Sequence, residues 1–416
     1  MSDKLALNGG PKVKTTPFGS GRRFGKEEKK ELEEAIDQNT LFYWYGHKVR
    51  EFTAKFAHMC GVPYCVAASS GTAAIHTALS SVGVTAGDEV ITSPITDMGS
   101  IIGIFYQNAI PVFADVDPRT YNLDPKSVEE KITPQTKAIE VVHLAGNAAD
   151  IGSILKIAKK HGVRVIEDCA QAYGCTVDGR PVGTFGDAGC YSLNDFKHIS
   201  AGDGGMVITR DEKIYRRAFR FVDKNYDRLA KDNGAMRRVE YLAPNYRMTE
   251  LQGAVAISQL DRLEHIVSTR EKYGNRLSEE IAGLPGIYPP KVEKNVRCSY
   301  WFYMFRIDEE EAGVSRDDFS RALSAEGIPN QPGYIPTCVY NYDLFRNKNV
   351  FPGSDLPFSI RHDPDSIHYG EGLCPVAEKV LKTGVRINIT EFFTPQDIED
   401  IGTAIRKVSR YYSEKR

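Results

Sequence analysis

The segment YCVAASSGTAA, which runs from Tyr64 to Ala74, decides the fold. Its first five residues form an apolar run of strand length, and small polar residues follow before a helical pattern begins at Ala73 and continues to Val82. An almost continuous apolar strand is typical of a sheet that is covered on both faces. The segment therefore predicts one strand–turn–helix unit of an α/β protein.

The same alternation continues as far as Thr209. Helical patterns such as Ile151–His161 separate further apolar runs of strand length, which are Glu89–Thr92, Ile110–Asp115, Ala138–His143, Arg164–Ile166, Ala188–Ser192 and Gly205–Thr209. Strands that alternate with helices favour a large, mostly parallel sheet with helices on both faces.

A second, smaller α+β domain is predicted after this region. Residues 250–280 carry the apolar spacing of one or two long helices, and a cluster of glycine and proline follows at 283–290. Beyond the cluster we expect a strand at Trp301–Ile307, a helix at Arg316–Glu326 and a final helix at Thr394–Arg410 that Thr394 caps. The expected domains are residues 1–280, with an extended rather than packed N-terminal arm, and residues 281–416.

Composition excludes some classes of function. The 416 residues include 53 Lys and Arg against 55 Asp and Glu, a formal net charge of −2, which argues against nucleic-acid binding through massed positive charge. No apolar run reaches the roughly 20 residues of a membrane span, and the first ten residues lack a signal-peptide pattern. Eight single cysteines and nine histidines without ligand spacing predict no metal site. We expect a cytoplasmic protein with no nucleic-acid or membrane partner.

Two polar segments follow strands and are candidates for ligand binding. Ser70, Gly71 and Thr72 open a helix, where backbone N–H groups and hydroxyls bind phosphate, although an ordinary helix cap has the same residues. Asp168 ends a strand, where open α/β sheets bind ligands, with Gln171 three residues on; a helix cap is again the alternative.

Two further segments complete the set. Tyr191–His198 contains Ser192 and Lys197 and precedes the glycines of 202–205, so Lys197 is either a desolvated amine able to form a Schiff base or a solvated loop lysine. Asn245–Gln252 is a polar and aromatic entry to a helix, or a plain helix start.

Together these four segments, in this order, resemble the DegT/DnrJ/StrS aminotransferases. The resemblance implies the pyridoxal-phosphate-dependent transferase fold of type I, as in aspartate aminotransferase, and amination of keto-sugars or related cyclic ketones. It also implies that pyridoxal 5'-phosphate alternates with pyridoxamine 5'-phosphate during the reaction.

The resemblance assigns a role to each matched residue. Lys197 would form the Schiff base and move the proton, Asp168 would pair with the pyridine nitrogen, and Gln171 would lie near the phenolic oxygen. The implied phosphate cradle is Ser70, Gly71, Thr72 and Ser192. Asn245 would reach the phosphate of a neighbouring subunit, which implies a homodimer with shared active sites.

Two features complicate the resemblance. Asp97 stands where the family usually has an aromatic residue that stacks on the pyridine ring, so Met98 or a backbone wall covers the ring, or the alignment is displaced by one residue. His198 follows Lys197, and a branch of the family with histidine in place of the lysine dehydrates sugars. A pyridoxal-phosphate-dependent sugar dehydratase is therefore the alternative to an aminotransferase.

Segments outside the four bear on the substrate. Leu5–Pro11, Gly333–Pro336 and Cys374–Glu378 resemble the branch that contains scyllo-inosose aminotransferases, or they are shared structural features of the small domain. We expect transfer of an amino group from glutamate or glutamine to a keto-sugar or keto-cyclitol in amino-sugar or aminocyclitol biosynthesis. His143 lies beside the site or is simply packed, and the aromatic Leu41–Gly46 lines a sugar pocket or belongs to the core or a subunit interface.

Overall fold

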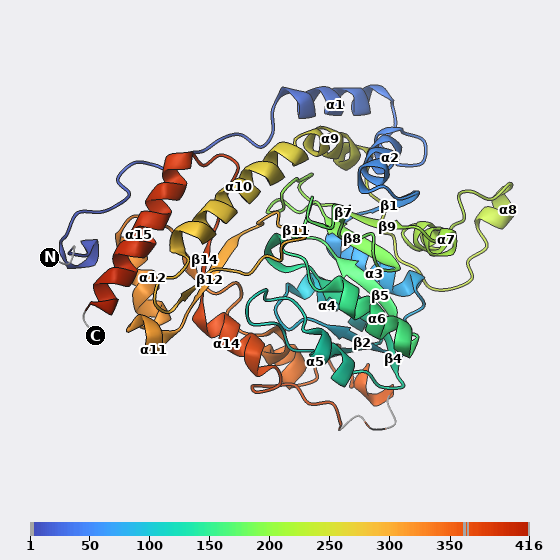
Figure 1. The fold of residues 1–416 in the computed structure, drawn as a ribbon. Coiled ribbons are helices and arrows are strands. Elements are labelled where there is room, and N and C mark those ends of the chain that lie inside the picture. The colour runs from blue at the N-terminus through green and yellow to red at the C-terminus, as the bar shows by residue number, and fades with distance from the viewer. Residues whose placement is uncertain (1–3, 361–362, 364–365, 415–416) are drawn as a thin grey trace.

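The largest element of the fold is a seven-stranded mixed sheet (Figure 1). The computed structural model describes residues 4–360, 363 and 366–414. The strands lie in the order β1 (Tyr64–Ala68), β9 (Gly205–Thr209), β8 (Ala188–Ser192), β5 (Arg164–Asp168), β4 (Thr136–Val142), β2 (Glu89–Thr92) and β3 (Ile110–Phe113). Only β9 runs antiparallel to its neighbours, which confirms the predicted α/β class with a mostly parallel sheet.

Helices cover both faces of this sheet because its strands are apolar on both sides. Val66, Ile166 and Val207 belong to the cluster on one face, against α3 (Gly71–Ser81), α4 (Met98–Tyr106) and α7 (Glu212–Phe221). The other face packs against α2 (Lys48–Cys60), α9 (Glu250–Asp261), α5 (Pro125–Glu130) and α6 (Ile151–His161). The strand ends thus lie between two helical layers, where ligands reach open α/β sheets.

The C-terminal part has its own sheet and core. Its four antiparallel strands lie in the order β10 (Ile287–Tyr288), β12 (Tyr303–Ile307), β14 (Gly384–Ile387) and β13 (Gln331–Pro332). The helices of this part are α11 (Glu309–Ala312), α12 (Arg316–Ala325), α14 (Pro375–Thr383) and α15 (Pro395–Ser413). The long helix α10 (Leu263–Ile281) connects the two parts, because its first half packs in the core of the large sheet and its second half in this core. Thr394 caps α15 in a reciprocal pair with Asp397, as the sequence predicted.

Shorter elements connect these parts. A three-stranded sheet consists of β11 (Val296–Arg297), β6 (Thr176–Val177) and β7 (Arg180–Pro181). The remaining helices are α1 (Lys26–Asp37), α8 (Asn233–Met236) and α13 (Asp343–Arg346), and 3-10 turns lie at Ala6–Asn8, Leu144–Gly146, Val339–Asn341 and Phe358–Ile360. Every helix of the described residues is too short or too polar to cross a bilayer.

The N-terminal segment is packed, which corrects the prediction of an extended, unpacked arm. Leu5 is fully buried in the hydrophobic cluster of the C-terminal part. The carboxylate of the buried Glu326 accepts hydrogen bonds from the backbone N–H groups of Ala6 (2.8 Å) and Val13 (3.2 Å). Lys14 Nζ lies 2.5 Å from a carboxylate oxygen of Asp397, and both side chains are buried. The glycines and prolines indicated an irregular chain, but not the distant partners that order it.

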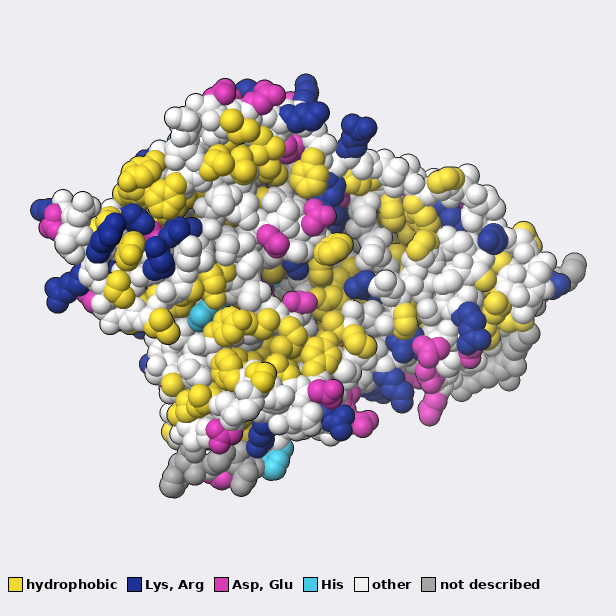
Figure 2. All heavy atoms as spheres, turned by 180° about the vertical axis from the view of Figure 1, so that it is seen from behind, with side chains coloured by type: hydrophobic (Ala, Val, Ile, Leu, Met, Phe, Trp, Pro, Cys, Tyr) yellow, Lys and Arg dark blue, Asp and Glu magenta, His cyan; other side chains and the backbone are white. Residues whose placement is uncertain are grey.

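The surface carries mixed charge. On the face seen in Figure 2, acidic and basic side chains are interspersed, and hydrophobic side chains gather across its centre. All eight cysteines are free thiols, and seven of them are buried.

Candidate active site

A cavity of about 720 Å³ lies between the carboxyl ends of the large sheet and the C-terminal part. It brings together seven of the eight residues that the sequence singled out. Those residues are Ser70, Gly71, Thr72, Asp168, Gln171, Ser192 and Lys197. Asn245 does not line it, so the structure of one chain brings all of the predicted residues together except the one expected to act in a partner subunit.

The first turn of α3 forms one end of the cavity. Ser70 caps the helix by accepting a hydrogen bond from the backbone N–H of Ala73 at 3.1 Å. A Cβ atom at Gly71 would lie 2.6 Å from the Cβ of Ser192, so only glycine permits this approach of β8 to the helix start. The helix end therefore offers N–H groups, hydroxyls and a favourable dipole to an anion. The cap and the anion site are compatible, because Ser70 occupies only one of these donors.

Asp168 lies at the carboxyl end of β5 and is 4% exposed. Its carboxylate accepts hydrogen bonds from the Ser100 hydroxyl at 2.8 Å and from the Ala170 backbone N–H at 3.0 Å. Burial raises the pKa of Asp168, while these two donors and the charge of Lys197 oppose the rise. Ser100 in turn contacts the Thr96 hydroxyl at 2.7 Å, so the orientation of the carboxylate is set by α4.

Lys197 follows β8 in the loop that faces Asp168 across the cavity. Burial lowers the pKa of the Lys197 amine below its usual value, and the charges of Asp168 and Asp97 work against this shift. A lysine with a lowered pKa is more often neutral and is then a nucleophile. The position of Lys197 in the cavity wall favours a partly desolvated amine over a solvated loop lysine.

The C-terminal part supplies the opposite wall. Tyr334 accepts a hydrogen bond from Gln171 Nε2 at 3.1 Å, while Gln171 Oε1 accepts one from the Ala145 backbone at 3.0 Å. The ring of Tyr334 stacks on Phe302, with centroids 5.0 Å apart. Gln171 thus connects the large sheet to this wall. Nothing in the local sequence around Gln171 indicated Tyr334 as its partner.

Three arginines, which the sequence motifs did not indicate, also line the cavity. Arg23 donates to the backbone carbonyls of Asp195 and Lys197, and Arg270 pairs with the buried Glu391 at 2.7 Å. Arg386 of β14 lies over the rings of Phe302 and Tyr334 and contacts Gln331. Among the described residues no carboxylate lies within ion-pair distance of Arg386. It is therefore the cavity guanidinium available to an anionic ligand.

Asp97 lines the cavity and caps α4 by accepting a hydrogen bond from the Gly99 backbone N–H at 2.8 Å. Met98 packs against a hydrophobic cluster and is not among the cavity-lining residues. The segment therefore presents a carboxylate, not a thioether, to the cavity.

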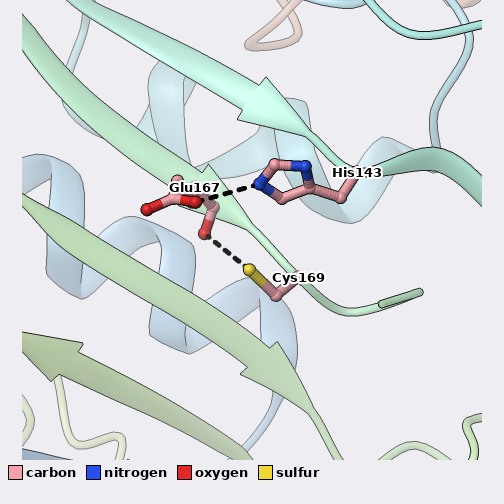
Figure 3. Close-up of side chains that lie close together, drawn as sticks. All are labelled: His143, Glu167 and Cys169. Atoms are coloured by element: carbon pink, nitrogen blue, oxygen red, sulfur yellow. Dashed lines mark hydrogen bonds and ion pairs between the residues drawn. The ribbon is translucent and has the colours of Figure 1, made fainter. Parts of the chain in front are cut away.

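His143, Glu167 and Cys169 lie close enough to suggest a metal site, with their ligand atoms within 4.8 Å of one another (Figure 3). His143 Nδ1 accepts a hydrogen bond from the Ala149 N–H, so Nε2 carries the proton and donates to Glu167 at 3.0 Å. Glu167 also accepts three backbone hydrogen bonds at 2.7 Å, from Gly183, Phe185 and Gly186. These ligand atoms are already occupied. The trio is a buried support behind Asp168, and His143 is packed rather than exposed to the cavity.

Asn245 lies on the segment between α7 and α9, where its backbone pairs with Asp223. Asp223 also binds Arg228 and Arg247 and accepts a hydrogen bond from Tyr43 of the aromatic segment Leu41–Gly46. Figure 1 shows that the α8 region of this segment projects away from the rest of the chain. Leu242 on it is 95% exposed.

A half-buried lysine and a strand-end carboxylate that line one cavity, together with an anion-binding helix end, define a class of protein. This is an α/β enzyme suited to Schiff-base chemistry with an anionic carbonyl compound. The profile of the DegT/DnrJ/EryC1/StrS aminotransferase family matches residues 22–362. The chain belongs to this family and is an aminotransferase.

Known proteins similar to the chain agree with this result. An L-glutamine:2-deoxy-scyllo-inosose aminotransferase of Streptoalloteichus tenebrarius is 33% identical, over 100% of both chains. A GDP-perosamine synthase of Caulobacter vibrioides is 36% identical, over 70% of this chain and 77% of its own. The solved aminotransferase from Psychrobacter cryohalolentis has a TM-score of 0.83 at 29% identity, covering 94% of this chain and 98% of its own. The predicted fold class is confirmed.

Proposed function

We propose that this aminotransferase binds pyridoxal 5'-phosphate and transfers the amino group of glutamine to a free keto-cyclitol. The observation that carries the proposal is the placement of Lys197 and Asp168 across one cavity, with the start of α3 beside them. The cyclitol relative named above covers the full length of the chain, which supports the same acceptor class.

The residues present fit this coenzyme. Its phosphate matches the N-terminus of α3 and the hydroxyls of Thr72 and Ser192, a cradle that a side chain at Gly71 would fill. Asp168, with its two hydrogen-bond donors, matches a protonated ring nitrogen. The bound coenzyme supplies an electron sink for the carbon that loses its proton.

Residues of the chain itself hold the proton that is transferred and shape the cavity around the substrate. The Nζ atom of Lys197 lines the site and can take up and release a proton, since burial lowers its pKa. The wall of Tyr334 and Phe302 excludes water from one side of the cavity. Gln171 presents its amide to the same space while Tyr334 and Ala145 fix its orientation.

Arg386 is the candidate residue for binding the amino donor. Its guanidinium lines the cavity and has no carboxylate partner among the described residues, whereas an α-amino acid brings one carboxylate. A guanidinium binds a carboxylate through two parallel hydrogen bonds. Arg386 stacks over two aromatic rings and one of its nitrogens contacts Gln331, which leaves the rest of its edge for such a ligand.

The charge of the cavity favours an uncharged acceptor. Arg23 is bound to backbone carbonyls and Arg270 to Glu391. Of the three arginines that line the cavity, only Arg386 could therefore pair with the two phosphates of a nucleotide-linked sugar. Asp97, Asp195 and Asp203 also line the cavity, and carboxylates accept hydrogen bonds from ring hydroxyls. A polyhydroxylated ring without phosphate fits this distribution.

A homodimer is part of the proposal. The α8 segment projects from the chain and exposes Leu229, Val239, Tyr241 and Leu242 beside Asn245. Burying these side chains against a second copy would remove them from water and place Asn245 near a neighbouring cavity. We also propose that residues 1–280 and 281–416 form the large and small domains, with the N-terminal residues packed on the small one.

The test is optical. Purified protein should take up the coenzyme and show an absorption that shifts when glutamine is added, and Lys197→Ala should abolish the shift. Lys126→Ala is the matched control, because the Lys126 side chain is 83% exposed on α5. A protein that takes up no coenzyme would overturn the proposal.

Substrate and reaction type are tested with labelled nitrogen. Glutamine labelled at its amino nitrogen should transfer the label to a keto-cyclitol faster than to a nucleotide-linked keto-sugar. The dehydratase alternative predicts a product without label, and it is not favoured by the full-length aminotransferase relative.

A further inference from the structure

Glu140 of β4 is a buried carboxyl group that the proposed reaction does not use. Its side chain is 0% exposed, and neither of its carboxylate oxygens has a hydrogen-bond partner among the described residues. Charged side chains are almost never fully buried without a partner, because the ionised form loses its hydration. An ionised carboxylate at this position would be strongly destabilised.

The strand register places Glu140 beneath Asp168. Glu140 lies opposite Ile166 of β5, and Val142 lies opposite Asp168. Because side chains alternate along a strand, Glu140, Ile166 and Asp168 face the same side of the sheet. On the other flank, the pairing of Ile91 with Ile139 brings Thr92 alongside Glu140.

Glu167 provides the contrast within the same sheet. It is also 0% exposed, but its carboxylate accepts three backbone hydrogen bonds. It accepts a fourth from His143 (Figure 3). These donors compensate an ionised carboxylate. Glu140 has no such donors, so its neutral form is the one that this environment accommodates.

Asp168 and Glu140 differ in the same way. Asp168 has the Ser100 hydroxyl and the Ala170 N–H as donors, and it faces Lys197 across the cavity. Two buried carboxyls this close in the sheet titrate as a coupled pair. One negative charge is favoured at the position with donors, and the second carboxyl keeps its proton.

We propose that Glu140 is a positioning residue for Asp168: the two carboxyls hold one proton between them, and the proton resides on Glu140, so that Asp168 stays ionised toward the cavity. The catalytic meaning of this pair rests on the proposed function, in which Asp168 meets the ring nitrogen of the coenzyme. The pair itself does not depend on it.

The surrounding charges are consistent with this assignment. Burial and the charge of Asp168 raise the pKa of Glu140 well above its usual range, and the nearby Thr92 hydroxyl opposes the rise. The other titratable groups that act on the pair are Cys190 of β8, Lys197 and His143. The charge of Lys197 favours the ionised form of Asp168, whereas His143, a neutral imidazole bonded to Glu167, adds no charge.

The experiment uses infrared spectroscopy of the coenzyme-free protein in D2O. The difference between the unaltered protein and Glu140→Gln at pH 7 should contain the carbonyl stretch of one protonated carboxylic acid. The exposed Glu212→Gln should instead lose a carboxylate band. If Glu140→Gln does not fold, Glu140→Leu provides the same subtraction. Absence of the acid band would overturn the proposal.

A titration tests the coupling. In Asp168→Asn the opposing charge is gone, so the acid band should disappear at a pH lower by about one unit or more than in the unaltered protein. A glutamate with a purely structural role would give a band that titrates at the same pH in both proteins. That result would overturn the proposal that Glu140 and Asp168 hold one proton between them. Because no coenzyme is present, failed coenzyme uptake would contradict the proposed function and leave this result standing.

Discussion

The Nζ atom of Lys197 lies 4.2 Å from the centroid of the Trp301 ring. Trp301 donates a hydrogen bond from its indole Nε1 to the backbone carbonyl of Phe196, at 2.7 Å, so the loop that carries the lysine also holds the ring against it. The ring face attracts the charged amine, while burial lowers the pKa of Lys197. The charge on this amine therefore depends on residues from separate parts of the chain.

Changing Asp97 should shift the pH dependence of coenzyme uptake. The charge of Asp97 raises the pKa of Lys197, so Asp97→Asn should lower this pKa further and increase the neutral fraction of the amine. The uptake rate is followed by absorption. The pH at which it rises should be lower than in the unaltered protein by up to about one unit. Asparagine still caps α4. Asp195→Asn is the control in the same cavity, and a shift to higher pH in Asp97→Asn would contradict the prediction.

Removing the guanidinium of Arg386 should weaken binding of the amino donor. A hydrogen-bonded charge pair contributes about 3 kcal/mol, so Arg386→Met should raise KM for glutamine roughly 100-fold. The KM for the ketone should change little in steady-state kinetics. Arg321→Met, on the exposed side of α12, is the control. An increase confined to the KM of the ketone would assign Arg386 to the acceptor instead.

Lys14→Met should destabilise the protein. The substitution leaves the buried Asp397 without its cation, and breaking a buried pair costs about 3 kcal/mol. The cost is reduced because Gly19 and Thr394 still donate to the carboxylate. Denaturant unfolding measures the change, and Lys12→Met, at an exposed position, should leave the free energy of unfolding unaltered.

Glu140→Leu should stabilise the coenzyme-free protein. Replacing a buried carboxyl that lacks partners by an apolar side chain removes its desolvation cost, a gain of about 1–3 kcal/mol in the free energy of unfolding. Glu167→Leu should have the opposite effect, because it leaves three backbone N–H groups unpaired. Thermal melts of both variants decide the matter, and destabilisation by Glu140→Leu would show that its carboxyl has a partner.

Leu242→Asp should weaken the dimer. A charge at the tip of the projecting segment opposes its burial against a second copy, so sedimentation should show more monomer at a given protein concentration. Leu7→Asp, an exposed position in the N-terminal turn, is the control. A protein that is monomeric without any substitution would contradict the proposed dimer.

Much of the fold followed from local pattern. The bounds of the strand at Tyr64–Ala68 and of the helix at Ile151–His161 agree with the structure, because the apolar period and the flanking glycine determine them. Residues 250–280, predicted as one or two helices, form two that meet at Arg262. Ser70, Asp168 and Lys197 meet at one cavity because strand ends in a mostly parallel sheet share an edge.

The remaining features depend on partners far away in the sequence. Arg386 lines the cavity only because β14 of the second sheet ends there, and no local spacing indicates this. Leu5 is buried only because α12 and α15 enclose it, although its segment is rich in glycine and proline. Glu140 stands in an apolar run, but its neighbour Asp168 appears only once β4 and β5 are paired.

The packed N-terminal segment has a mechanical consequence. Its anchors are Leu5 and Lys14 on the small part, while Arg23 holds the carbonyl of Lys197 and accepts hydrogen bonds through its own carbonyl from Gln259 and Arg262. Tension applied to the first residues would therefore be transmitted along this segment to the loop that carries the lysine. A surface attachment or fusion at this end would load the catalytic loop directly, whereas the same attachment after α15 would not.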